Sequence, residues 1–207
     1  MMPDPHDPLN RSLTPGTLFY EPYLNKIRER KWEFLRMMDI TATNANPQQD
    51  WSDRRLPTDF IQTGVINPRS PAPGTSITGN QITGCAYEFV VELCNRVNVS
   101  LWINIPHMAT DDFMLKLAQL IAFGSDGVNP YTTTMTNPKY RPLNKWLKVF
   151  VEYSNEIWSS GGSFPQGNWA EIQAGIAGIS RPLFTAQRVC RMFSIFQSVL
   201  GTSSQLV

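Results

Sequence analysis

The sequence has few of the residues that build metal sites and disulfide frameworks. It contains two histidines and three cysteines, an odd number with no C-x-x-C spacing. A zinc site would need mostly carboxylate ligands, so we expect neither a metal site nor any other cofactor. Cys94 and Cys190 lie within apolar helical stretches, and buried thiols are therefore predicted for them.

Long apolar runs and an excess of charge of one sign are also missing. No run approaches the roughly 20 apolar residues that a membrane span needs, and the start, M-M-P-D-P-H-D-P, lacks the apolar stretch of a signal peptide. The net charge is +1 and the basic residues are dispersed. We therefore expect no nucleic acid and no membrane as partner. The compartment stays open, because a longer protein could carry its own signal.

What is present suits a globular protein with one sizeable core. The 207 residues, 42% of them apolar, predict a single domain over residues 1–207. Residues 1–18 are rich in proline, aspartate and serine and are predicted to be an irregular segment. A second loop, rich in proline, glycine and serine, is expected near residues 67–80.

Apolar periodicity predicts helices that alternate with strands. Helices are predicted over residues 20–31, 86–97, 110–123, 169–179 and 182–200. Strands are predicted over residues 34–40, 101–105 and 147–153, with another beginning at 205–207. Thr110 is the expected N-cap of its helix and Gly124 the expected end. This alternation predicts an α/β fold with a parallel sheet.

Polar side chains stand at the end of each predicted strand. In chain order they are Arg36 and Asp39, then Asn104 and His107, then Asn155 and Glu156. Because the carboxyl ends of parallel strands lie on one edge of the sheet, we expect these side chains to converge there. A carboxylate and a carboxamide at the end of a buried strand suit chemistry better than packing.

The pattern E-x-x-N-E, from Glu152 to Glu156, resembles the fourth-strand motif of clan A glycoside hydrolases. These are retaining (β/α)₈-barrel enzymes that include many cellulases and mannanases. The resemblance implies that Glu156 is the general acid/base and that Asn155 binds the sugar 2-hydroxyl. Arg36 and His107 match the arginine and histidine that end the second and third strands in that clan. The segments L-R-M-M-D, W-I-N-I-P-H and V-E-Y-S-N-E-I-W are similar to bacterial barrel proteins described as cellulose-binding or cellulase-like.

The resemblance implies a partial barrel that covers roughly strands two to four. A complete barrel typically needs ~250 residues, and the clan's nucleophile, a seventh-strand glutamate, has no counterpart here. Ile157 also stands where many clan members have proline. We therefore expect a fragment of a retaining hydrolase that acts on β-linked polysaccharide, inactive alone unless Asp39 or Glu152 substitutes. Unpaired sheet edges would favour self-association.

Two tryptophans are candidates for stacking against sugar rings. Trp158 lies close to the end of the third predicted strand, and Trp51 lies in the loop after the first. Two other classes of function stay open. One is a carbohydrate-binding protein without turnover. The other is an unrelated α/β domain whose strand-end polar groups serve structure.

The individual site residues have structural alternatives as well. Glu156 could cap the helix that follows or pair with an arginine. Arg36 could be a buried arginine paired with Asp39, and His107 could be a hydrogen-bonded loop histidine. For Glu152, a structural partner inside the barrel is favoured over a catalytic role.

Overall fold

The computed structural model describes residues 18–59, 62, 83–160, 164–201 and 205–207. The predicted loop near 67–80 and nearly all of the predicted segment 1–18 lie outside these residues. Three parallel strands form one sheet in the order β1-β2-β3. They are β1 (Phe34–Arg36), β2 (Ser100–Ile105) and β3 (Val149–Tyr153). The predicted α/β fold with a parallel sheet is confirmed.

Five α-helices and a short 3₁₀-helix occur in the described residues. They are α1 (Glu21–Arg28), η2 (Trp51–Asp53), α2 (Tyr87–Val97), α3 (Asp111–Phe123), α4 (Pro165–Ala177) and α5 (Arg181–Leu200). As predicted, the Thr110 hydroxyl accepts a hydrogen bond from the Phe113 amide, and α3 ends at Gly124 with φ +71°. None of the described helices has the length and apolar character to cross a bilayer.

Several predicted elements have different bounds, and two of them differ by four residues at one end. The strand expected over 34–40 ends at Arg36, because the chain turns there. The Met37 amide still bonds to Trp102 O at 2.9 Å, but the Thr41 amide bonds back to Met37 O at 3.0 Å. Helix α4 begins at Pro165 rather than at residue 169, since a proline suits the first turn of a helix.

Two of the cysteines are buried and one is not. Burial raises the pKa of the Cys85 and Cys94 thiols to about 12. The prediction of a buried Cys190 is wrong, because its side chain is exposed on α5. The three thiols are all free.

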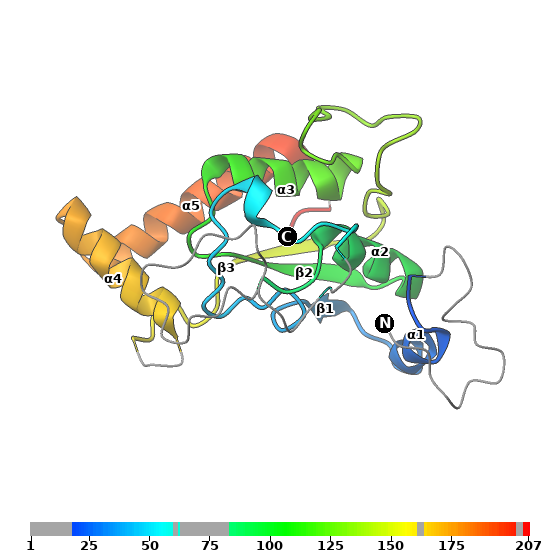
Figure 1. Cartoon of the computed structure of the whole chain (residues 1–207), viewed down its shortest axis with the longest axis horizontal. Coiled ribbons are helices and arrows are strands. Elements are labelled where there is room, and N and C mark those ends of the chain that lie inside the picture. Colours follow the sequence, from blue (N-terminus) through cyan, green and yellow to red (C-terminus); the bar gives the residue numbers. More distant parts are fainter. Residues whose placement is uncertain (1–17, 60–61, 63–82, 161–163, 202–204) are drawn as a thin grey trace.

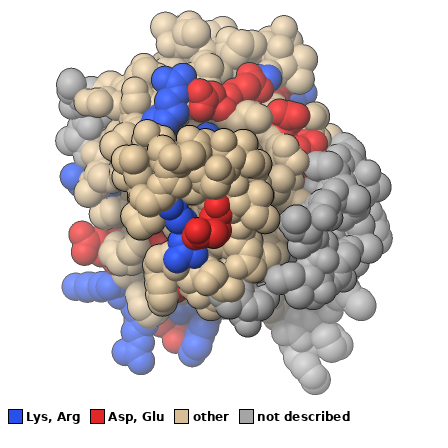
Figure 2. All heavy atoms as spheres, turned by 90° about the vertical axis from the view of Figure 1, so that its left-hand side faces the viewer, with Lys and Arg blue, Asp and Glu red and all other residues tan. Residues whose placement is uncertain are grey.

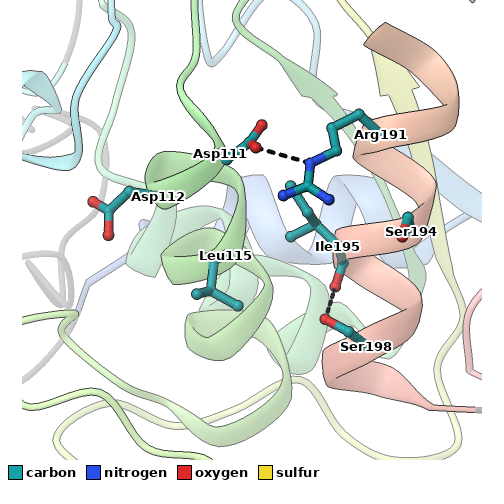
Figure 3. Close-up of a pocket in the computed structure, with 7 residues that line it drawn as sticks. All are labelled: Asp111, Asp112, Leu115, Arg191, Ser194, Ile195 and Ser198. Atoms are coloured by element: carbon teal, nitrogen blue, oxygen red, sulfur yellow. Dashed lines mark hydrogen bonds and ion pairs between the residues drawn. The ribbon is translucent and has the colours of Figure 1, made fainter. Parts of the chain in front are cut away.

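The helices cover one face of the sheet. In Figure 1, α2 and α3 lie to one side of the strands and α5 runs behind them, whereas α4 projects to the far left. On the covered face Leu101, Ile103 and Val149 are fully buried. Figure 3 shows α3 and α5 side by side, where Asp111 and Arg191 form an ion pair at 2.8 Å. In the described part of the chain, helices therefore pack against one face of the sheet.

The opposite face of the sheet carries aromatic rings. The half-buried rings of Phe34, Trp102 and Phe150 form a cluster in which the Phe34 centroid lies 5.0 Å from Trp102 and 5.3 Å from Phe150. The guanidinium of Arg36 lies 5.3 Å from the Trp102 ring centre. Side chains alternate along a strand, so the next residues on this face toward the carboxyl ends are Asn104 and Glu152.

The first residue of β3 is also paired on the side of the strand that faces away from β2. Leu206 forms a parallel bridge with Val149, in which the Val149 amide bonds to Gln205 O at 2.7 Å and the Val207 amide to Val149 O at 3.0 Å. This bridge lies where the sequence predicts a new strand. It extends the sheet beyond β3 by a single bridged pair of residues.

Candidate functional site

Glu152 connects all three strands at the carboxyl edge of the sheet. Arg36, the last residue of β1, donates two hydrogen bonds to it, from Nε to Oε2 at 2.9 Å and from Nη2 to Oε1 at 2.7 Å. From β2, Trp102 Nε1 and Asn104 Nδ2 donate to Oε2 at 2.8 and 2.7 Å. This bidentate, charge-assisted arrangement holds the strand ends together. Arg36 therefore pairs with Glu152, not with Asp39.

Asn155 joins this pair to the loop after β1. Its Oδ1 accepts a further hydrogen bond from Arg36 Nη2 at 2.9 Å, and its Nδ2 donates to Asn44 Oδ1 at 3.0 Å. The side chain is 5% exposed. The structure thus brings Arg36 and Asn155 together at the carboxyl edge, where the sequence places both of them.

Gln166, in the first turn of α4, completes the network. Its Nε2 donates to Asn44 Oδ1 at 2.8 Å and to Asn155 O at 2.7 Å, and its Oε1 accepts from the Ala45 amide at 3.1 Å. The side chain is fully buried. Sequence reasoning missed both Asn44 and Gln166. The only signal was their presence in polar segments beside predicted strand ends.

The two loops that this network joins have an unusual backbone. Five non-glycine residues in the described part of the chain have positive φ, and four of them lie in these loops: Ala42 (+49°), Ala45 (+57°), Ser154 (+60°) and Glu156 (+47°). Such conformations cost about 1–3 kcal/mol each, and they collect at functional sites where the surroundings enforce them. The fifth residue, Asn98, ends α2 in the ordinary way.

The Glu156 carboxylate has no structural partner in the described part of the chain. Its side chain is half-buried and makes no hydrogen bond or ion pair with a described residue. It does not cap α4, which follows Phe164 and has no side-chain cap. The two structural alternatives for Glu156, a helix cap and an arginine pair, are therefore not seen. Trp158 lies two residues further on, with 72% of its surface exposed.

His107 follows β2 at the carboxyl edge of the sheet, but its surroundings differ from those of Arg36, Asn155 and Glu156. It is 4% exposed, and its ring meets Trp169 of α4 edge-to-face at 5.2 Å. Burial lowers the pKa of His107 to about 4, so the ring is neutral at pH 7. Its Nδ1 has no hydrogen-bond partner in the described residues, and its carbonyl accepts from the Tyr153 hydroxyl at 2.6 Å. The described contacts of His107 do not include Arg36, Asn155 or Glu156.

Trp51 lies in the core, and its described contacts do not include Arg36, Glu152 or Asn155. It is 5% exposed, its ring meets Phe113 at 5.4 Å, and the Arg54 guanidinium covers it at 4.1 Å. Its Nε1 donates to Asp126 O at 2.8 Å. This arrangement leaves only 5% of Trp51 exposed, and its role in the sugar contact that the sequence suggested stays a prediction. Of the two candidate tryptophans, Trp158 is the one that the structure leaves accessible.

Among the described residues, no three histidine, cysteine, aspartate or glutamate side chains gather as a metal site would require. Figure 2 shows the end of the molecule where α4 projects, with acidic and basic side chains interspersed in a mostly uncharged surface. Near the end of β3, the chain offers the Asn155 amide, the Glu156 carboxylate and the Trp158 ring, which is 72% exposed.

Comparison of the chain with protein-family models, with curated proteins and with solved structures found no match.

Proposed function

We propose that this chain is part of a (β/α)₈ barrel, covering roughly strands two to four, in which Glu156 is the general acid/base of a retaining glycoside hydrolase acting on β-linked polysaccharide. One observation supports this most directly. Glu156 is a half-buried carboxylate without a partner among the described residues, and it follows Asn155, whose amide is held by Arg36. The parallel order β1-β2-β3, with helices on one face, agrees with such a barrel.

The proposed chemistry assigns a role to each group at the edge. Glu156 gives its proton to the glycosidic oxygen as the bond to the anomeric carbon breaks. Asn155 Nδ2 carries two hydrogens, of which Asn44 accepts one, so the other is free to donate to a sugar hydroxyl. Trp158 presents an exposed ring to the C–H face of a pyranose.

Double displacement also needs a second carboxyl group about 5–5.5 Å from the first. Glu152 is unsuited to this role, since Arg36, Trp102 and Asn104 donate four hydrogen bonds to its oxygens. Asp39 is exposed and makes no side-chain hydrogen bond with a described residue. The nucleophile is therefore Asp39 or a carboxylate from outside the described residues.

Because the oxygens of Glu152 already accept four hydrogen bonds, this residue does not supply the second carboxyl group that turnover needs. This favours a second candidate function, a carbohydrate-binding protein without turnover. In that case Asn155 and Trp158 hold the sugar, and Glu156 acts only as a hydrogen-bond acceptor. The two functions differ in whether a proton leaves Glu156, so proton transfer is what the experiment must measure.

Azide can supply the missing nucleophile in the experiment. The 207-residue chain is incubated with phenyl β-cellobioside and sodium azide. Azide attacks the anomeric carbon, the carbon–oxygen bond breaks, and the Glu156 proton goes to the phenoxide oxygen, which yields cellobiosyl azide and phenol. We expect azide-dependent phenol release that falls about 10²–10⁴-fold in Glu156→Gln, because the amide has no proton to give.

A better leaving group provides the control. Dinitrophenolate leaves without protonation, so the loss in Glu156→Gln should shrink with 2,4-dinitrophenyl β-cellobioside. Equal phenol release by the parent chain and Glu156→Gln would rule out the acid role. Binding of cellohexaose without any phenol release would identify the chain as a binding protein.

A further inference from the structure

We propose that Gln166 is the positioning residue of this site: it fixes the Asn155 amide, through Asn44 and the Asn155 carbonyl, in the one orientation that presents an N–H to the ligand. This inference rests on the proposed function for its ligand, a β-linked sugar. Its structural part can be tested without any ligand.

The orientation of the Gln166 amide is determined by three partners. Its Nε2 uses both hydrogens, on Asn44 Oδ1 at 2.8 Å and on Asn155 O at 2.7 Å, and its Oε1 accepts from the Ala45 amide at 3.1 Å. A reversed amide would set its NH₂ group against the Ala45 N–H and its oxygen against two acceptors. Because Gln166 is fully buried, no water replaces these bonds.

The orientation of Asn155 follows from that of Gln166. Asn44 Oδ1 accepts from both Gln166 Nε2 and Asn155 Nδ2, so the oxygen of Asn44 must face Asn155. On the other side Arg36 Nη2 donates to Asn155 Oδ1. A reversed Asn155 amide would place its NH₂ group against the guanidinium and its oxygen against that of Asn44. Only one orientation satisfies both neighbours, and it leaves one N–H of Asn155 unused.

Gln166 also holds the backbone on both sides of the site. The Asn155 carbonyl that it binds lies between Ser154 and Glu156, which both have positive φ. Its bond to the Ala45 amide holds a third residue of this kind. One buried side chain from α4 thus joins the two loops that carry Asn44 and Glu156.

The matched variants are Gln166→Met and Gln173→Met. Both replace a glutamine of α4 by an apolar side chain of similar length, but Gln173 makes no side-chain hydrogen bond with a described residue. Gln166→Glu is the second test variant, in case Gln166→Met does not fold. It keeps the shape and the acceptor for Ala45, and it replaces the two N–H donors by a carboxylate oxygen that faces Asn44 Oδ1 and the Asn155 carbonyl.

The ligand-free measurement is nuclear magnetic resonance of the ¹⁵N-labelled 207-residue chain. In the parent chain and in Gln173→Met we expect one sharp pair of Asn155 side-chain N–H signals with slow hydrogen exchange. In Gln166→Met or Gln166→Glu that pair should broaden and exchange faster, while the rest of the backbone spectrum stays dispersed. Unchanged Asn155 signals in a folded Gln166 variant would overturn the inference.

The second measurement is azide-dependent phenol release from phenyl β-glucoside and from its 2-deoxy analogue. Misplacement of a positioned group by about 1 Å costs up to about 10²-fold in rate, so a loss of that order is expected for the Gln166 variants with the first substrate. With the 2-deoxy sugar, which offers Asn155 no 2-hydroxyl, the loss should largely disappear. An equal loss on both substrates would mean that Gln166 is only structural. If the parent chain releases no phenol, the proposed function fails, and the Asn155 signals alone decide the inference.

Discussion

Glu152 and Glu156 are the same residue type on one short segment, yet their surroundings are opposite. Glu152 accepts hydrogen bonds from Arg36, Trp102 and Asn104, whereas Glu156 has no partner among the described residues. The first geometry keeps a carboxylate in place and unavailable. The second leaves the carboxylate oxygens without a described partner.

Glu152→Gln should destabilise the protein without affecting Glu156 directly. The substitution removes the counter-charge of Arg36 and places an NH₂ group near its guanidinium. Arg36 and Glu152 are 35% and 30% exposed, so solvent screens part of the loss. We expect the free energy of unfolding in urea to fall by about 1–2 kcal/mol. Glu171→Gln is the control, because its ion pair with Arg181 is 3.4 Å long and Glu171 is 65% exposed. A change of the same size in both variants would contradict a special role for Glu152.

His107 should make stability depend on pH. Burial lowers its pKa to about 4 in the folded protein, against about 6.5 for an unfolded chain. Between these values the unfolded state binds more protons, so stability rises with pH. The contribution is fully present above pH 6.5 and is lost as the pH falls from 6.5 toward 4, by about 3 kcal/mol in total. Urea titrations at pH 7, 5.5 and 4.5 measure it. The titrations of His107→Leu should show a smaller fall, and an identical fall would exclude His107 as the cause.

The helices were easier to predict than the first strand. Helix α3 has a complete set of signals in its sequence, with Thr110 at one end and Gly124 at the other. The apolar run after Arg36 looked like a longer strand, but composition alone does not distinguish a strand from a buried turn. Here Thr41 Oγ1 donates to Met37 O at 2.7 Å, a local bond that competes with pairing to a neighbouring strand.

The site was predictable only where the sheet determines it. Arg36 and Asn155 were expected to converge because both end parallel strands. Asn44 and Gln166 could not be found in this way. Their mutual hydrogen bond joins positions 122 residues apart, and that between Asn44 and Asn155 joins positions 111 apart. No local pattern encodes such a contact, since it depends on where α4 packs.

The glycine that ends α3 allows the cost of an unfavourable backbone conformation to be separated from the cost of a steric overlap. Gly124 and Gly178 both end helices with positive φ, at +71° and +67°. A Cβ on Gly124 would overlap the Tyr140 carbonyl oxygen, whereas a Cβ on Gly178 would meet nothing within 4 Å. Gly178→Ala should therefore lower the free energy of unfolding by about 1 kcal/mol, because alanine must adopt a left-handed backbone conformation. Gly124→Ala should cost at least about 2 kcal/mol more, because the loop that contains Tyr140 must move. Thermal unfolding of the two variants measures this difference. Equal losses of stability would show that the loop that contains Tyr140 moves at no cost.

At the scale of the whole molecule, the sheet is covered unequally. Helices bury one face, while the other presents Phe34, Trp102 and Phe150 as a half-buried cluster. Both sheet edges also lack a full partner strand in the described residues: β1 pairs only with β2, and the outer neighbour of β3 is the single bridge at Val149. Unpaired edges beside apolar surface favour association with another chain.

We therefore expect the chain to associate with itself through these edges. In sizing chromatography with light scattering, the mass should rise with protein concentration. Phe150→Lys places a charge on the aromatic face and should shift the chain toward monomer, because a charge on that face opposes edge-to-edge pairing. Val128→Lys is the control, since Val128 is 78% exposed in a loop and should leave the mass unchanged. A monomer at every concentration, with a sharp thermal transition, would mean that the aromatic face and both edges are already satisfied. The proposed partial barrel would then lose its main structural support.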